Sequence, residues 1–158
     1  NSRRQLERST ESHNTIRLDG ENSSEVWGGF RVARRAKIIS FKEEKNKIVA
    51  THDGYKRIGA FHTRSFSKVN QKLIVEDIIE SKKSHQIESF LHFHPDCNIS
   101  VEEGKIKVDS DITIAFKSHR NLIVEEYDFP LGYNQSKKAC KIRTSPEKQS
   151  KIEISYEN

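Results

Sequence analysis

Short alternations of apolar and polar residues, separated by turn residues, recur along most of the chain and restrict the fold more than any other feature. The segment 111–116 alternates with a period of two, which is typical of a strand that buries one face. Turn signals recur about every 8–12 residues, the spacing expected of an antiparallel sandwich or barrel. No segment carries a sustained apolar stripe with the helical period of 3.6 residues. The sequence therefore predicts an all-β fold, an antiparallel β-sandwich, with no helix of any length.

The expected strands follow one another as hairpins. Segments 36–41 and 47–51 form the first pair, 60–66 and 73–79 form the second, and a strand at 87–94 follows. Further strands are expected at 99–101, 105–108, 111–116, 121–127, 139–144 and 151–156, with the last two joined by a loop that contains Pro146. Residues 3–10 lack apolar alternation, so we expect a loop or an unpaired strand there.

A length of 158 residues suits one domain, and we treat 1–158 as a single β-sandwich domain or a fragment of one. Hydrophobic residues make up 33% of the chain and charged residues 32%, a lean composition that suits a two-layer β-structure. No apolar run reaches the roughly 18–20 residues that span a bilayer, so no membrane span is expected. The sequence starts at Asn1 and contains no methionine, which suggests a fragment.

The net charge of +5 favours an anionic partner, either an acidic polysaccharide or a nucleic acid. Aromatic residues are sparse, and no helix-turn-helix, zinc-finger or RNP pattern is present. We therefore do not expect nucleic-acid binding. A solvated basic face without a partner is the simpler alternative.

The stretch 12–20 reads Ser-His-Asn-Thr-Ile-Arg-Leu-Asp-Gly, and Trp27, the only tryptophan, follows in 25–32. A histidine here opens a short strand that ends in an Asp-Gly turn. This order resembles the heparinase II/III-like polysaccharide lyases, in the part where their C-terminal β-sandwich binds a metal ion. The resemblance implies that His13 is a ligand of zinc or another divalent metal, whose other ligands lie upstream of this chain. On its residues alone, a lone strand histidine is more often structural.

The same resemblance extends through the run His-Asp-Gly-Tyr at 52–55 and the His-Thr-Arg at 62–64, and covers residues 4–93. It implies an enzyme that cleaves uronic-acid polysaccharides by β-elimination, with its catalytic residues upstream of His13 and none in this chain. An N-terminal α/α-toroid of the same protein and an acidic polysaccharide are the implied partners. The implied location is the periplasm or the exterior of a bacterium, with the cytoplasm left open.

Tyr55 and Arg64 lie near expected strand ends, and both types of side chain can hydrogen-bond a sugar. They are weak candidates for substrate binding. The structural alternative, which we favour, is that Tyr55 packs in the core and that Arg64 pairs with an acid such as Glu76 or Asp77.

His92, His94 and Asp96 form a second candidate site, because alternation places the two histidines on one strand face. This spacing allows a metal site, as in a small cupin-like metalloprotein. The simpler reading is a solvent-facing strand. A non-catalytic carbohydrate-binding or scaffold sandwich is another alternative to the lyase.

Three further residues have no clear chemical role. Trp27, beside Gly28 and Gly29, either stacks on a sugar or packs in the core, and we expect core burial. Cys97 and Cys140 follow no C-x-x-C pattern, and we expect free, partly buried thiols. If strands before His13 are missing, an apolar surface should lie beside the strand that starts there, and the chain should self-associate.

Overall fold

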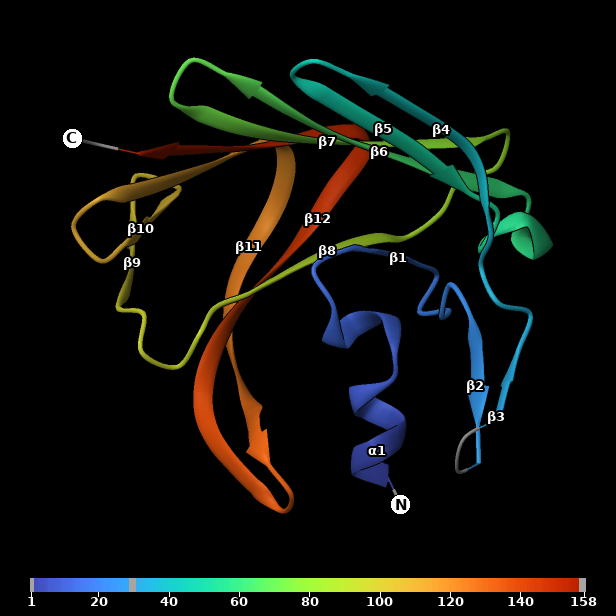
Figure 1. The fold of residues 1–158 in the computed structure, drawn as a ribbon, viewed down its shortest axis with the longest axis horizontal. Coiled ribbons are helices and arrows are strands. Elements are labelled where there is room, and N and C mark those ends of the chain that lie inside the picture. Colours follow the sequence, from blue (N-terminus) through green and yellow to red (C-terminus); the bar gives the residue numbers. More distant parts are fainter. Residues whose placement is uncertain (1, 29–30, 157–158) are drawn as a thin grey trace.

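The structure, a computed structural model, describes residues 2–28 and 31–156 (Figure 1). Gly29 and Phe30, which follow Trp27 and Gly28 in the sequence, lie outside the described residues. Its elements are α1 (Ser2–Glu7), the 3-10 turn η1 (Thr10–Ser12), β1 (Ile16–Leu18), β2 (Glu25–Trp27), β3 (Arg31–Ala33), β4 (Ile38–Glu44), β5 (Lys47–His52), the 3-10 turn η2 (Lys56–Ile58), β6 (Ala60–Val69), β7 (Lys72–Ser81), β8 (Ile87–His92), β9 (Ile99–Glu102), β10 (Lys105–Val108), β11 (Ile112–Gly132) and β12 (Gln135–Tyr156).

Antiparallel pairing joins these strands in the order β4-β5-β6-β7-β12-β11-β10-β9, while β8 pairs with both β1 and β12. In Figure 1 the β4–β7 layer lies at the top, and β8 with β1 runs beneath it. The predicted all-β, antiparallel architecture is therefore confirmed. The two predicted hairpins, β4–β5 and β6–β7, are both present with antiparallel register.

The hairpin of β11 and β12 is much longer than the sequence predicted. Segments 112–116 and 121–127 belong to one strand of 21 residues, and β12 continues through Pro146 for 22 residues. The expected loop at Pro146 is thus wrong. Pro146 pairs with His119, where the register is irregular on both sides. A proline, which has no N–H to donate, is tolerated at such a bulge.

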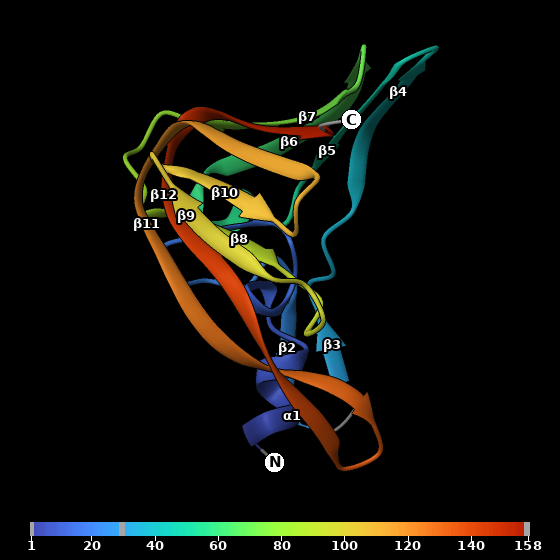
Figure 2. The same ribbon diagram turned by 90° about the vertical axis from the view of Figure 1, so that its left-hand side faces the viewer.

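β12 changes partner along its length, and this gives the sandwich its two layers. Residues 149–155 pair with β7 in the upper layer, whereas Lys141–Thr144 pair with β8 below. The hairpin bends between these two regions and curves away from the upper layer (Figures 1 and 2). Its free arm then passes beside α1.

Two clusters of buried side chains fill the space between the layers. Val75, Ile106, Val108, Ile114 and Ile152 face inward from β7, β10, β11 and β12. The second cluster lies under the other end of the sheet and consists of Ile16, Leu18, Tyr55, Ala60, Ile79 and Ile87. Because Ile16 and Leu18 are almost fully buried, β1 covers this second cluster and carries no exposed apolar strip.

The N-terminal segment forms a short helix, so the expectation of a loop or strand at residues 3–10 is wrong. α1 has the sequence Ser-Arg-Arg-Gln-Leu-Glu, and none of its residues is buried. Arginine, glutamine, leucine and glutamate are good helix formers. Arg3 and Glu7, one turn apart, form an ion pair of 2.9 Å. A segment of six residues is too short to show the apolar period of a helix. The hydrophobic pattern of the sequence therefore does not indicate this helix.

Trp27 is 44% exposed, and the prediction of core burial is wrong. It lies in β2, which pairs only with β3 in a two-stranded sheet apart from the main one.

Several exposed apolar side chains lie on one face of β4, β5 and β6. In the pairing register Ile48 is opposite Phe66, which is opposite the buried Val75. Ile48, Phe66 and Phe41 on the edge strand β4 are all exposed. The inward face of the sheet is therefore covered near β7 and left open towards β4.

Candidate functional site

His13 lies in a loop between η1 and β1, not at the start of a strand. Its backbone is extended, its N–H donates to the Thr10 carbonyl over 3.2 Å, and its own carbonyl accepts from Thr15 over 2.9 Å. The imidazole ring is exposed. Among residues 2–28 and 31–156, no side chain hydrogen-bonds this ring, so its nitrogens are available to a ligand.

Asn14 connects this loop to the end of β8. Its Oδ1 accepts one hydrogen bond from the backbone N–H of His92 at 2.8 Å and a second from His92 Nδ1 at 2.9 Å. Burial, with the charges of Lys141 and His13 as smaller causes, lowers the pKa of His92 from 6.5 to about 4. His92 is therefore neutral at pH 7, and its ring contacts Tyr127 edge-on with centroids 4.9 Å apart.

His13 and His92 line one cavity of about 440 Å³ between α1, η1, β8 and the free arm of the β11–β12 hairpin. Its lining consists of Arg3, Leu6, Glu7, Ser12, His13, His92, Glu126, Tyr127, Asp128, Pro130, Lys138 and Lys141. Three cations and three carboxylates balance, and Lys138 pairs with Asp128 at 3.0 Å. The charged side chains of the cavity therefore balance, and its two histidines are the side chains that could bind a ligand through a neutral nitrogen.

A buried chain of hydrogen bonds runs from β5 to the Asn14 loop. His52 Nε2 lies 3.0 Å from His62 Nδ1, and His62 Nε2 lies 2.6 Å from Asp77 Oδ1. Arg64 donates to both oxygens of Asp77, at 2.7 and 2.9 Å, and to the Asn14 carbonyl. The predicted pairing of Arg64 with an acid is confirmed, and the acid is Asp77.

The protonation of this chain follows from its partners. The N–H of Gly54 donates to His52 Nδ1, so the neutral His52 ring carries its proton on Nε2 and donates to His62. Burial above all, then the neighbouring His62, lowers the pKa of His52 from 6.5 to about 4. Burial opposes ionisation of Asp77, but hydrogen bonds from His62 and Arg64 outweigh it and lower the pKa of Asp77 to about 2.

Tyr55 is fully buried, in agreement with the packing interpretation. Its hydroxyl donates to the Ile16 carbonyl over 2.8 Å, and burial raises its pKa to about 12. Tyr55 thus joins the η2 region to β1. Arg64, the other weak sugar-binding candidate, is engaged by Asp77 and the Asn14 loop.

His94 and Asp96 lie beyond the end of β8 and do not share a site with His92. His94 Nδ1 is 3.5 Å from Asp96, which also pairs with Lys137 at 2.5 Å, and all three side chains are exposed. No group of three or more His, Cys, Asp or Glu residues is placed to hold a metal in the part of the chain that the structure describes. Cys97 and Cys140 are free and partly buried, as expected.

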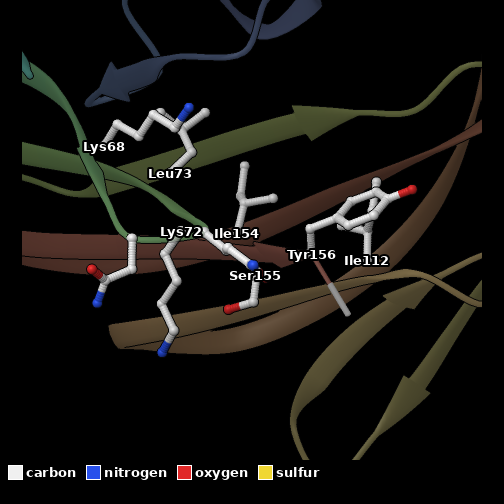
Figure 3. A pocket seen from close by; sticks show the side chains of 9 residues that line it. Lys68, Lys72, Leu73, Ile112, Ile154, Ser155 and Tyr156 are labelled. Carbon is white, nitrogen blue, oxygen red and sulfur yellow. The ribbon is translucent and has the colours of Figure 1, made fainter. Parts of the chain in front are cut away.

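An apolar hollow of about 450 Å³ lies far from the histidines, where the β6–β7 turn meets the ends of β11 and β12 (Figure 3). Leu73, Ile112, Ile154 and Tyr156 provide its apolar walls, with Lys68 and Lys72 at its rim. It continues the open inward face of the sheet, and its lining contains no histidine, cysteine or carboxylate.

The sequence matches the family described as Heparinase II/III-like, C-terminal, over residues 1–157. The chain belongs to this family. No curated protein matches the sequence. No helix within residues 2–28 and 31–156 has the length and apolar character needed to cross a bilayer.

Solved structures similar to this heparinase II/III-like domain include two polysaccharide-lyase family members. The heparan sulfate lyase HepC from Pedobacter heparinus has a TM-score of 0.71 and 19% sequence identity, and the Heparinase III-BT4657 gene product has a TM-score of 0.70 and 16% identity. In each case the alignment covers 98% of this chain and 25% of the solved chain. The present sequence therefore spans about a quarter of the length of these structures, and the likeness shows the shared fold.

Proposed function

We propose that this domain is the C-terminal β-sandwich of a lyase that cleaves uronic-acid polysaccharides by β-elimination. The observation that carries the proposal is the family match over residues 1–157. The similarity to a structure described as a heparan sulfate lyase supports it, and so does the net charge of +5, which favours an acidic polymer.

β-Elimination needs a base that removes the weakly acidic C5 proton and groups that stabilise the charge developing on the neighbouring carboxylate. The family resemblance assigns these groups to an N-terminal toroid and to a sandwich histidine upstream of His13. In this proposal the present domain contributes no catalytic residue. It supplies a rigid support and one metal ligand beside the site.

The 158-residue chain alone is expected to show no lyase activity, because the base, the acid and most of the substrate cleft lie outside it. Incubation of the purified chain with alginate, heparin and heparan sulfate should give no rise in ultraviolet absorbance from unsaturated uronate. The full-length protein is the positive control and should produce this signal with at least one polymer. Turnover by the isolated domain would refute the assignment of the catalytic groups.

A divalent metal at His13 is also part of the proposal, and the structure allows a partial test of its fit. The ring is exposed, has no side-chain partner among the described residues and faces a cavity that holds a second histidine. Neutral imidazole is a good ligand for zinc. These residues fit one side of a metal site, whose remaining ligands come from outside residues 1–158.

Replacing His13 by alanine in the full-length protein should remove most of the bound metal, because one protein ligand supplies a large share of the binding free energy. Metal content per protein is measured by elemental analysis after gel filtration. His94→Ala is the matched control, since His94 is exposed and lies outside the His13 cavity. An unchanged metal content in His13→Ala would exclude His13 as a metal ligand. A loss of metal in His94→Ala would also contradict this assignment.

A further inference from the structure

The positive charge of the chain is concentrated in two short segments. Residues 2–8 and 25–37 together hold seven arginines and lysines and only two glutamates. In the rest of the chain, basic and acidic residues are equal in number. The net charge of +5 is therefore carried by α1, by the ribbon that β2 and β3 form, and by the residues next to them.

These two segments adjoin each other in the fold. Arg8, which follows α1, donates from its guanidinium to the Arg31 carbonyl on β3 over 3.3 Å. α1 lies beside β2 and β3 in two perpendicular views, on the side towards which the free arm of the β11–β12 hairpin also points (Figures 1 and 2). The helix and the ribbon thus form one continuous basic region.

An exposed indole and an exposed guanidinium lie opposite each other on the ribbon. Trp27 pairs with Arg31 in the register of β2 and β3, which places the two side chains on the same face. Glu25, the carboxylate of the ribbon, is already paired with Arg34 at 3.0 Å. Within residues 2–28 and 31–156, no hydrogen bond or ion pair engages the Trp27 indole or the Arg31 guanidinium, so both groups are available to a ligand.

The base of the ribbon is fixed to the loop that carries His13. Asn22 Oδ1 accepts from the Thr10 N–H over 2.7 Å, and the Ser23 N–H donates to Thr10 Oγ1 over 2.9 Å. The Thr10 carbonyl in turn accepts from the N–H of His13. A ligand that binds the ribbon therefore meets a support that is already ordered, which lowers the entropic cost of binding.

We propose that the β2–β3 ribbon binds the acidic polysaccharide chain, with Trp27 stacked on a sugar ring and Arg31 bound to a carboxylate or sulfate group. An indole offers a large flat apolar face, which fits the C–H face of a sugar ring. A guanidinium binds a planar carboxylate through two parallel hydrogen bonds. An acidic polysaccharide presents both features along its length, and a region that holds the whole net charge attracts it. The inference rests on the proposed function and names residues that hold the polymer outside the catalytic groups.

The test uses the full-length protein with heparin, heparan sulfate and alginate. Calorimetry gives the Kd for each polymer, and ultraviolet absorbance of the unsaturated product gives KM and kcat. Trp27→Ala and Arg31→Gln should each raise Kd and KM by about 3–10-fold, with kcat nearly unchanged, because they remove binding that is equal in the ground and transition states. Trp27→Phe keeps a flat apolar ring and should retain most of the affinity.

Two control variants match these changes elsewhere on the surface. Tyr156→Ala removes an exposed aromatic ring at the apolar hollow, and Arg120→Gln removes an exposed guanidinium on β11. Neither should change Kd or KM. Added salt should weaken polymer binding less in Arg31→Gln than in the natural protein, because one of the screened charges is missing.

The outcomes separate this inference from the proposed function. Cleavage by the natural protein with unchanged Kd and KM in both ribbon variants would overturn the inference and leave the proposed function in place. A lower kcat and a lower unfolding midpoint at unchanged Kd would mean that the ribbon packs against the toroid, which also overturns it. If the natural protein cleaves none of the polymers, the proposed function fails and Kd alone decides. Weaker binding in both ribbon variants, but not in the controls, then supports the inference, and no binding of any polymer by the natural protein overturns it.

Discussion

Replacing Asp77 by alanine is expected to lower the free energy of unfolding by about 3 kcal/mol or more. The variant leaves the His62 N–H without an acceptor in a side chain that is only 2% exposed. It also removes both carboxylate contacts of Arg64, whose side chain is 18% exposed. A buried donor or charge that has lost its partner lowers the free energy of unfolding by more than the intact ion pair contributes to it.

Urea unfolding of the isolated domain, at a concentration where it is monomeric, measures this change. Asp96→Ala is the matched control, since Asp96 also pairs with a histidine and a cation but is exposed. It should leave stability nearly unchanged because solvent screens surface ion pairs. Equal effects of the two variants would mean that the Asp77 network does not stabilise the fold.

The same carboxylate gives the stability a defined dependence on pH. The pKa of Asp77 falls from 3.8 to about 2 in the folded state, so the folded state favours the ionised form. The stabilisation that this shift provides is complete above pH 3.8 and is lost as the pH falls towards about 2. The difference in unfolding free energy between the natural chain and Asp77→Ala should narrow over this interval, and a constant difference would contradict the shift.

The isolated domain is expected to self-associate through the open inward face of its sheet. Phe41 is 61% exposed and Phe66 is 44% exposed, next to the exposed Ile48 and Leu73. Burying one such phenylalanine contributes about 1.5–3 kcal/mol, and contiguous apolar surfaces of this kind mark contact sites. β4 is also an edge strand that can pair with another chain.

Sedimentation velocity over a dilution series measures the association, which should weaken on dilution. The double variant Phe41→Ser/Phe66→Ser should be monomeric at concentrations where the natural chain is not. Tyr133→Ser is the control, because Tyr133 is 93% exposed but lies at the tip of the β11–β12 hairpin. A monomeric natural chain throughout the series would show that the open face does not bind a second copy.

Local patterns were sufficient to predict the strands but not their lengths. The β4–β5 and β6–β7 hairpins follow from β-branched segments around polar turns, a signal contained within each hairpin. The pattern predicts a shorter β11–β12 pair, because a proline such as Pro146 normally interrupts a strand. The strand can contain Pro146 because the register between β11 and β12 is irregular opposite His119. This irregularity depends on how the two strands pair, so the sequence around Pro146 alone does not reveal it.

In the candidate site, contacts within one hairpin can be predicted from the sequence, whereas contacts between residues far apart in the chain cannot. Arg64 was expected to pair with Glu76 or Asp77, since both belong to the neighbouring strand of the same hairpin. The His52–His62 contact was missed, although counting back from the β5–β6 turn places these residues directly opposite each other. The link from Asn14 to His92 joins residues 78 apart and has no local signal. Only the crossing of β8 beside β1 brings them together.

The change of partner along β12 bears on how the domain unfolds. One continuous strand is hydrogen-bonded to β7 in the upper layer and to β8 in the lower layer. Sub-global opening normally follows boundaries between units that share few contacts, and no such boundary separates layers built on a common strand. The two halves of the sandwich should therefore lose their structure in one cooperative step, and protection of backbone amides against hydrogen exchange should be highest in the central part of β12.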